Sequence, residues 1–84
     1  MYDVRIERRA ERDIDRLPQK EFDHILPKIN ALAHDPRPAG CCKLAGSRND
    51  WRVRVGDYRI LYEILDSVQV VRVMRVRHRR EVYR

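Results

Sequence analysis

The chain has 84 residues, a length that suits one folded domain, so we expect residues 1–84 to form a single domain. It has no apolar run of about 18 residues and no apolar signal region at its N-terminus, which argues against a membrane span and against secretion. The only two cysteines, Cys41 and Cys42, are adjacent and cannot close a loop, a usage that favours a reduced, cytoplasmic setting.

Charge is distributed unevenly along the chain. Residues 1–42 carry eight Lys or Arg and eight Asp or Glu, whereas residues 43–84 carry eleven and five, so the whole net charge of +6 comes from the second half. Ten of those eleven basic residues are arginines, whose planar fork suits phosphate and carboxylate groups. This segregation predicts a polyanionic partner, either nucleic acid or an acidic protein; the alternative is a solvated charged surface with no partner.

The first half predicts one strand and two helices. Residues 2–7 alternate apolar and charged side chains, as half-buried strands do. From residue 8 the apolar positions recur at helical spacing and predict a short helix that Pro18 ends. The same spacing over residues 22–33 predicts a longer helix, in which Pro27 requires either a kink near Asp23 or a later start.

The second half predicts strands. A proline-rich loop over residues 35–40 precedes a short edge strand at 41–44 and a turn at 45–50. A hairpin follows over Trp51–Tyr62, in which two strand patterns meet at a Gly-Asp turn and the alternation places Arg52 and Arg54 on one face.

The returning strand of this hairpin continues to Leu65. A turn at residues 66–67 then leads to a β-branched strand over 68–76, and the tail predicts a helical turn. The order of elements predicts an α+β fold: a two-helix hairpin on one face of a small, mostly antiparallel sheet of four strands, with a short C-terminal helical turn.

The sequence offers no metal or cofactor site that its spacing would identify. The three histidines lack ligand spacing, adjacent cysteines cannot form a CxxC site, and the glycines are isolated, so we expect no metal and no cofactor. What remains is a basic and aromatic set on strands that we expect to be neighbours. Its members, the candidate catalytic residues, are Arg52, Arg54, Arg59, His78, Arg79 and Tyr83.

These residue types suit cleavage of RNA by its own 2′-OH. That reaction requires cations to stabilise the charged phosphorane, and groups that take one proton from the 2′-OH and give one to the leaving 5′-oxygen. Arginines can supply the first, and Tyr or His can supply the second. Five further basic residues of the second half are predicted to bind RNA: Lys43, Arg48, Arg75, Arg77 and Arg80.

Each candidate also has a structural alternative. Arg52 and Arg54 can be solvated or can pair with acids such as Glu63, Tyr83 can pack over the sheet, and His78 can be an ordinary surface residue. Strand periodicity also places Arg59 on the same side of its strand as Leu61, and Arg79 on the same side as Val71 and Val73. A bulge or a strand end is therefore needed for both arginines to reach one site.

The segment KLAGSRNDWRVRVGDYRILYEI and the tail VRHRREVYR resemble the RelE group of the RelE/ParE toxins of type II toxin-antitoxin systems. The Leu17-Pro18 break, the long helix and Asp35-Pro36 follow the same pattern, so the resemblance covers nearly the whole chain. It implies a toxin that enters the ribosomal A site, cleaves mRNA there and is neutralised by a RelB-like antitoxin in a hetero-oligomer. Arg52, Arg54, Arg59, Arg79 and Tyr83 match the positions that carry this activity in the family, and His78 adjoins them.

Two other functions remain open at this point. A ParE-like inhibitor of DNA gyrase has the same fold, although such chains generally lack the terminal Arg and Tyr. A non-catalytic RNA-binding protein would also use the same basic surface.

Overall fold

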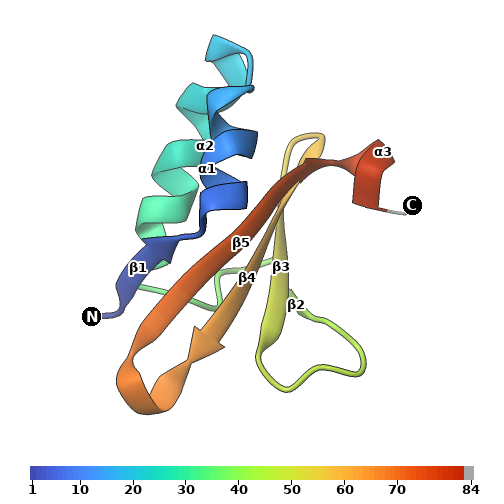
Figure 1. Cartoon of the computed structure of the whole chain (residues 1–84). Helices are drawn as coiled ribbons and strands as arrows, with labels where there is room; N and C mark the ends of the chain where they lie inside the picture. Colours follow the sequence, from blue (N-terminus) through green and yellow to red (C-terminus); the bar gives the residue numbers. More distant parts are fainter. Residues whose placement is uncertain (83–84) are drawn as a thin grey trace.

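The computed structural model describes residues 1–82, which form one five-stranded sheet and three α-helices (Figure 1). The sheet has the order β1-β5-β4-β3-β2, in which β1 runs parallel to β5 and every other pair is antiparallel. In chain order the elements are β1 (Asp3–Ile6), α1 (Arg8–Asp15), α2 (Gln19–Ala31), β2 (Cys42–Lys43), β3 (Asp50–Val55), β4 (Tyr58–Leu65), β5 (Val70–His78) and α3 (Arg79–Val82).

The predicted α+β class is confirmed, and three details of the prediction are wrong. The sheet has five strands rather than four, because the two-residue strand β2 pairs with β3. The last strand runs over Val70–His78 rather than 68–76, because a 3₁₀ turn at Asp66–Val68 and the left-handed Gln69 (φ 52°) delay its start. The second helix does not start late: α2 begins at Gln19 and continues through Pro27.

Pro27 is tolerated because the helix is held by its buried face. Ile25 and Ile29, on either side of the proline, are both 0% exposed, whereas Pro27 itself is exposed. An interior proline costs roughly 3 kcal/mol, and fully burying two isoleucine side chains contributes about 1.5–3 kcal/mol each. Tertiary packing therefore outweighs the local penalty.

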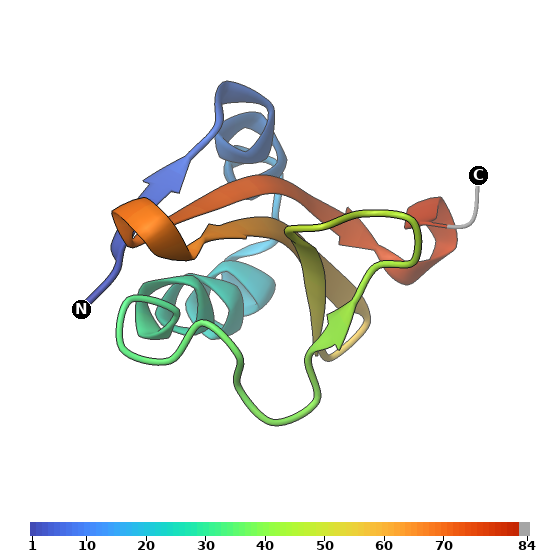
Figure 2. The ribbon, with the colours of Figure 1, turned by 90° about the horizontal axis from the view of Figure 1, so that it is seen from below.

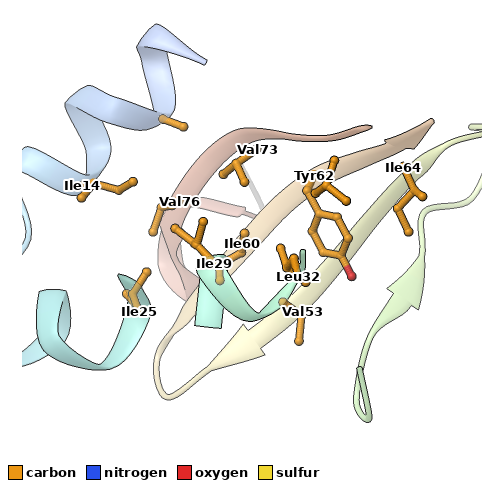
Figure 3. Close-up of a cluster of buried hydrophobic side chains, with 12 residues drawn as sticks. Ile14, Ile25, Ile29, Leu32, Val53, Ile60, Tyr62, Ile64, Val73 and Val76 are labelled. Carbon is orange, nitrogen blue, oxygen red and sulfur yellow. The ribbon is translucent and has the colours of Figure 1, made fainter. Parts of the chain in front are cut away.

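The core lies between the two long helices and one face of the sheet. Ile14 of α1 and Ile25, Ile29 and Leu32 of the second helical segment pack toward the apolar residues of β3, β4 and β5 (Figure 3). Seen from below, α1 lies beside β5, whereas α2 lies on the side of β4 and β3 (Figure 2). No helix within residues 1–82 is long and apolar enough to span a membrane.

A bulge in β5 changes which side chains face the core. The pairing moves from Leu61 with Arg75 to Tyr62 with Val73, so Met74 is an extra residue without a partner in β4. Val71 and Val73 are buried before the bulge and Val76 after it. The expected irregularity is thus present, and it turns Arg75 and Arg77 toward the opposite face.

The free edge of β5 beyond the bulge is closed by α1. The carboxylate of Asp13 accepts hydrogen bonds from Nε and Nη2 of Arg75, at 2.8 and 3.1 Å, and from the backbone N–H of Val76 at 3.0 Å. Strand edges otherwise leave such N–H groups unpaired. Asp13 therefore joins the first helix to the last strand.

Tyr62 joins the centre of the sheet to the proline-rich loop. It is fully buried, and its hydroxyl donates a 2.8 Å hydrogen bond to the carbonyl of Pro36. Burial, with a smaller effect of the neighbouring Cys41, raises the pKa of this phenol far above its usual value, so it remains a donor.

We expect Tyr62→Phe to lower the free energy of unfolding by about 1–2 kcal/mol, because the Pro36 carbonyl loses its partner inside the core. Thermal and urea unfolding measure the change. Tyr58→Phe is the matched control, because the Tyr58 hydroxyl forms no hydrogen bond within the described chain, and it should change stability by less than about 0.5 kcal/mol. Equal effects of the two substitutions would contradict this role for the Tyr62 hydroxyl.

Candidate nucleic-acid interface

Arginines from three strands lie side by side on the sheet face that points away from the helices; we call this the arginine face. Arg54 of β3 pairs in register with Arg59 of β4, which in turn pairs with Arg77 of β5. One step further along the sheet, Arg52 and Arg75 flank Leu61. Their strand neighbours Val53, Ile60 and Val76 are buried on the helix side.

Two adjacent hollows open on this face and share Arg54 and Arg59. The first, of about 200 Å³, is lined by these two arginines with Arg52, Gly40 and Cys42. The second, of about 330 Å³, is lined by the same two with Arg79 and Arg80. Ligand pockets usually enclose roughly 300–1,000 Å³, so the first hollow is smaller than such pockets and the second is at the lower end of their range, sizes that suit a small group such as one phosphate.

The arginines differ in whether carboxylates neutralise them. Arg72 pairs with Glu63 at 2.9 Å and with Glu7 at 3.3 Å, so the predicted alternative partner of Arg52 and Arg54 is already engaged. Within residues 1–82, Arg52 and Arg54 form no ion pair; the Nε of Arg54 donates to the Gly56 carbonyl at 3.1 Å. Their charge therefore remains available to an anion.

Two residues predicted to bind RNA are engaged within the protein. Arg75 holds Asp13, as described above, and Nε of Arg77 lies 3.1 Å from Glu81 in α3. Burial disfavours the charged form of Asp13, but the hydrogen bonds from Arg75 and Val76 outweigh it and hold the pKa of this carboxyl below its usual value. Arg75 thus has a structural role, and its charge is largely neutralised.

The tail returns to the hairpin turn between β3 and β4, which places Arg79 beside the arginine face. The backbone N–H of Arg79 donates to the Asp57 carbonyl at 2.7 Å, and its Nε lies 3.9 Å from the Asp57 carboxylate. Gly56 supplies the positive φ (59°) that this two-residue turn needs. The end of β5 and the hairpin turn therefore meet at one end of the sheet (Figure 1).

His78 is not brought together with the arginines. It pairs in register with Tyr58 and falls on the side of Val76, the face toward the helices. Its ring meets that of Tyr58 edge to face, with centroids 5.2 Å apart, and its Nδ1 accepts a 3.2 Å hydrogen bond from the backbone N–H of Arg80. This is the geometry of a helix N-cap.

The remaining predicted residues lie near the arginine face, on the opposite face of the sheet, or outside the described residues. Lys43 pairs with Trp51 and thus falls on the other face from Arg52, Arg48 is exposed in the loop before β3, and Arg80 lines the second hollow. Tyr83 lies outside the described residues.

The sequence did not single out several residues that build the site. Gly40 and Cys42 line the first hollow, and Asp57 and Tyr58 hold the start of the tail. Only Asp57 had a usable signal, because its place in the Gly-Asp turn fixes where the hairpin ends.

A model of the family described as "ParE toxin of type II toxin-antitoxin system, parDE" matches residues 4–83. Toxin RelG of Mycobacterium tuberculosis is 31% identical over 84 residues, covering 99% of this chain and 97% of that protein. Among solved structures, the archaeal RelE-RelB complex from Pyrococcus horikoshii is 25% identical, with a TM-score of 0.83 over 95% of this chain and 97% of that one. The toxin-antitoxin complex RelBE2 of M. tuberculosis is 29% identical, with a TM-score of 0.81 over 92% and 96%.

Proposed function

Because the chain belongs to the RelE/ParE toxin family of type II toxin-antitoxin systems, we propose that it is a ribosome-dependent endoribonuclease. In this proposal it cleaves mRNA in the ribosomal A site and thereby stops translation. Its cognate partner is a RelB-like antitoxin. The observation that carries this proposal is the pair of hollows sharing Arg54 and Arg59. Arginines from β3, β4 and α3 line these two adjoining hollows, where they would face a bound phosphodiester.

In the proposed reaction the 2′-hydroxyl of one nucleotide loses its proton to a base and attacks the adjacent phosphorus, and the bond from phosphorus to the 5′-oxygen breaks as that oxygen takes up a proton. The products are a 2′,3′-cyclic phosphate and a 5′-hydroxyl. Arg52, Arg54, Arg59 and Arg79 stabilise the extra negative charge of the phosphorane, with two-pronged hydrogen bonds that suit phosphate oxygens. For Tyr83 we propose proton transfer or stacking on the cleaved nucleotide, on the strength of the resemblance alone.

Inhibition of DNA gyrase is the second candidate, because the matching family model is described by ParE. Sequence relatives point the other way: RelG and a putative toxin RelE1 of Methanocaldococcus jannaschii, 26% identical, are both of the Rel type. Arg79 beside the hollow also favours RNA cleavage, since ParE-like chains generally lack it.

The experiment adds the purified chain to a translating extract and maps the 5′ ends of a reporter mRNA, with a gyrase supercoiling assay in parallel. We expect cuts within the codon at the A site, no cuts in the same mRNA without ribosomes, and unchanged supercoiling. Lost supercoiling with intact mRNA would establish the gyrase reading instead. Salt-sensitive RNA binding without a cut product under any translating condition would leave a non-catalytic RNA-binding protein.

His78 provides a separate prediction, because its geometry suits positioning of the tail rather than proton transfer. Asn can cap a helix through its side-chain oxygen but cannot transfer a proton near neutral pH, whereas Ala can do neither. We therefore expect His78→Ala to slow cleavage by about tenfold, the effect of roughly 1.4 kcal/mol, and His78→Asn to retain most of the rate with an unchanged pH profile. If the Asn variant is as slow as the Ala variant, His78 takes part in the chemistry.

A further inference from the structure

The helix α1 carries arginines at every fourth position on its solvent side. Arg8, Arg12 and Arg16 are all exposed and fall within an arc of about 80° at 100° per residue, on the side opposite the buried Ala10 and Ile14. Arg16 keeps a right-handed helical backbone as the C-cap residue, so the row continues to the helix end. We call this row the α1 stripe.

Nothing within residues 1–82 neutralises the stripe: none of its three arginines forms an ion pair in the described structure. Like charges four residues apart destabilise a helix by roughly 0.2–0.5 kcal/mol per pair. The stripe contains two such pairs, and Glu11 and Asp15, which lie three residues after Arg8 and Arg12, offset part of this repulsion by the same rule.

The stripe lies on the flank of α1 that turns toward the arginine face. Asp13, about 60° beyond Arg16 around the helix, holds Arg75. Arg8 and Arg9 line a hollow of about 470 Å³ together with Leu61, Met74 and Arg75 of the sheet, and Glu7 and Asp50 line it as well. The acids Glu11 and Asp15 fall on the other flank. The exposed arginines of α1 thus lie next to one end of the arginine face.

We propose that the α1 stripe binds the backbone of a double-helical RNA next to the single strand that enters the arginine face. The stripe spans about 12 Å along a straight helix, which matches a row of phosphates. Recognition of single strands uses aromatic side chains as stacking surfaces, and α1 contains none. Double-helical RNA is instead bound through its phosphates and 2′-hydroxyls. The inference rests on the proposed function, with ribosomal RNA as the source of the duplex in the cell.

The test compares the full chain with Arg12→Gln/Arg16→Gln in binding to intact ribosomes and to a short RNA hairpin, over a series of salt concentrations. Gln and Arg have similar helix propensities, so the variant should fold. Lys20→Gln/Lys28→Gln is the matched control, because it removes two exposed charges from α2 instead. Affinity for a cognate antitoxin and for an unpaired oligonucleotide is measured in parallel.

We expect the stripe variant to bind ribosomes and the hairpin at least tenfold more weakly at low salt, with a salt slope less negative by about one to two. The control should stay within about threefold, and the thermal midpoint of the stripe variant should change by only a few degrees, because both replaced side chains are exposed. Unchanged duplex binding overturns the inference, as does a loss confined to the antitoxin or to the unpaired oligonucleotide. These binding measurements hold whether or not the chain cleaves mRNA, so this inference and the proposed activity can fail separately.

Discussion

Replacing Arg54 by Ala should reduce the single-turnover rate of A-site cleavage by about 100- to 1,000-fold, the usual cost of removing one preorganised donor from a developing oxyanion. Arg54 lines both hollows and forms no ion pair in the described chain. Its exposed side chain contributes little to the core, so the thermal midpoint should change by only a few degrees. Arg54→Lys, which keeps the charge but loses the fork, should recover part of the rate.

Arg5→Ala is the control for this prediction. Arg5 is an exposed strand arginine at the other edge of the sheet, where its Nε pairs with Asp3 at 3.0 Å. Its loss should leave cleavage within about twofold. Near-normal cleavage by Arg54→Ala would show that the hollows do not hold the reacting phosphate.

The largest effect on stability should come from Asp13→Ala. This substitution leaves the partly buried Arg75 guanidinium and the Val76 N–H without their acceptor, and side-chain exposures of 12% for Asp13 and 23% for Arg75 leave limited room for water to compensate. Breaking a buried ion pair costs about 3–5 kcal/mol; this pair is partly exposed, so we expect about 2–3 kcal/mol. Urea unfolding measures it, with Asp15→Ala, an exposed acid on the same helix, as the control.

The same contact makes stability depend on pH in a defined direction. The pKa of Asp13 is lower in the folded state than in the unfolded chain, because the hydrogen bonds from Arg75 and Val76 outweigh the effect of burial. Its charge therefore stabilises the fold above the unfolded pKa of about 3.9, and this contribution is lost as pH falls through the folded pKa. The stability gap between wild type and Asp13→Ala should shrink below about pH 4. A gap that stays constant to pH 2 would contradict an ionic origin.

Local patterns predicted the parts of this fold that depend on local residues. Alternation through Trp51–Val55 placed Arg52 and Arg54 on one face, and helical spacing identified α1 and α2, because burial repeats with the period of each element. Cys42–Lys43 lies within the edge strand predicted over 41–44, and counting it as a member of the sheet, as its pairing with β3 requires, gives five strands rather than the predicted four.

The features of the fold that depend on contacts between residues far apart in sequence could not be located from the sequence. The bulge at Met74 lies in a run of valines interrupted by Arg72 and Arg75, and the strand beyond it is held by Asp13, which binds the Val76 N–H from 63 residues away in sequence. His78 adjoins Arg79 in sequence but faces the other side, where it caps the backbone of Arg80. The α1 stripe was hidden because a charge count over the first half cancels Arg8, Arg12 and Arg16 against the eight acids of that half, whichever side of the helix those acids lie on.

The claim that the substrate's own 2′-hydroxyl is the nucleophile can be tested with a single atom. A reporter mRNA carrying 2′-deoxyribose at the one nucleotide 5′ of the mapped scissile phosphate is translated in the presence of the wild-type chain. We expect no cut at that phosphate, whereas the all-ribose mRNA is cut there to give a 2′,3′-cyclic phosphate and a 5′-hydroxyl. Cleavage of the deoxy-substituted site at the normal rate would contradict the mechanism, because the nucleophile would then have to be another group.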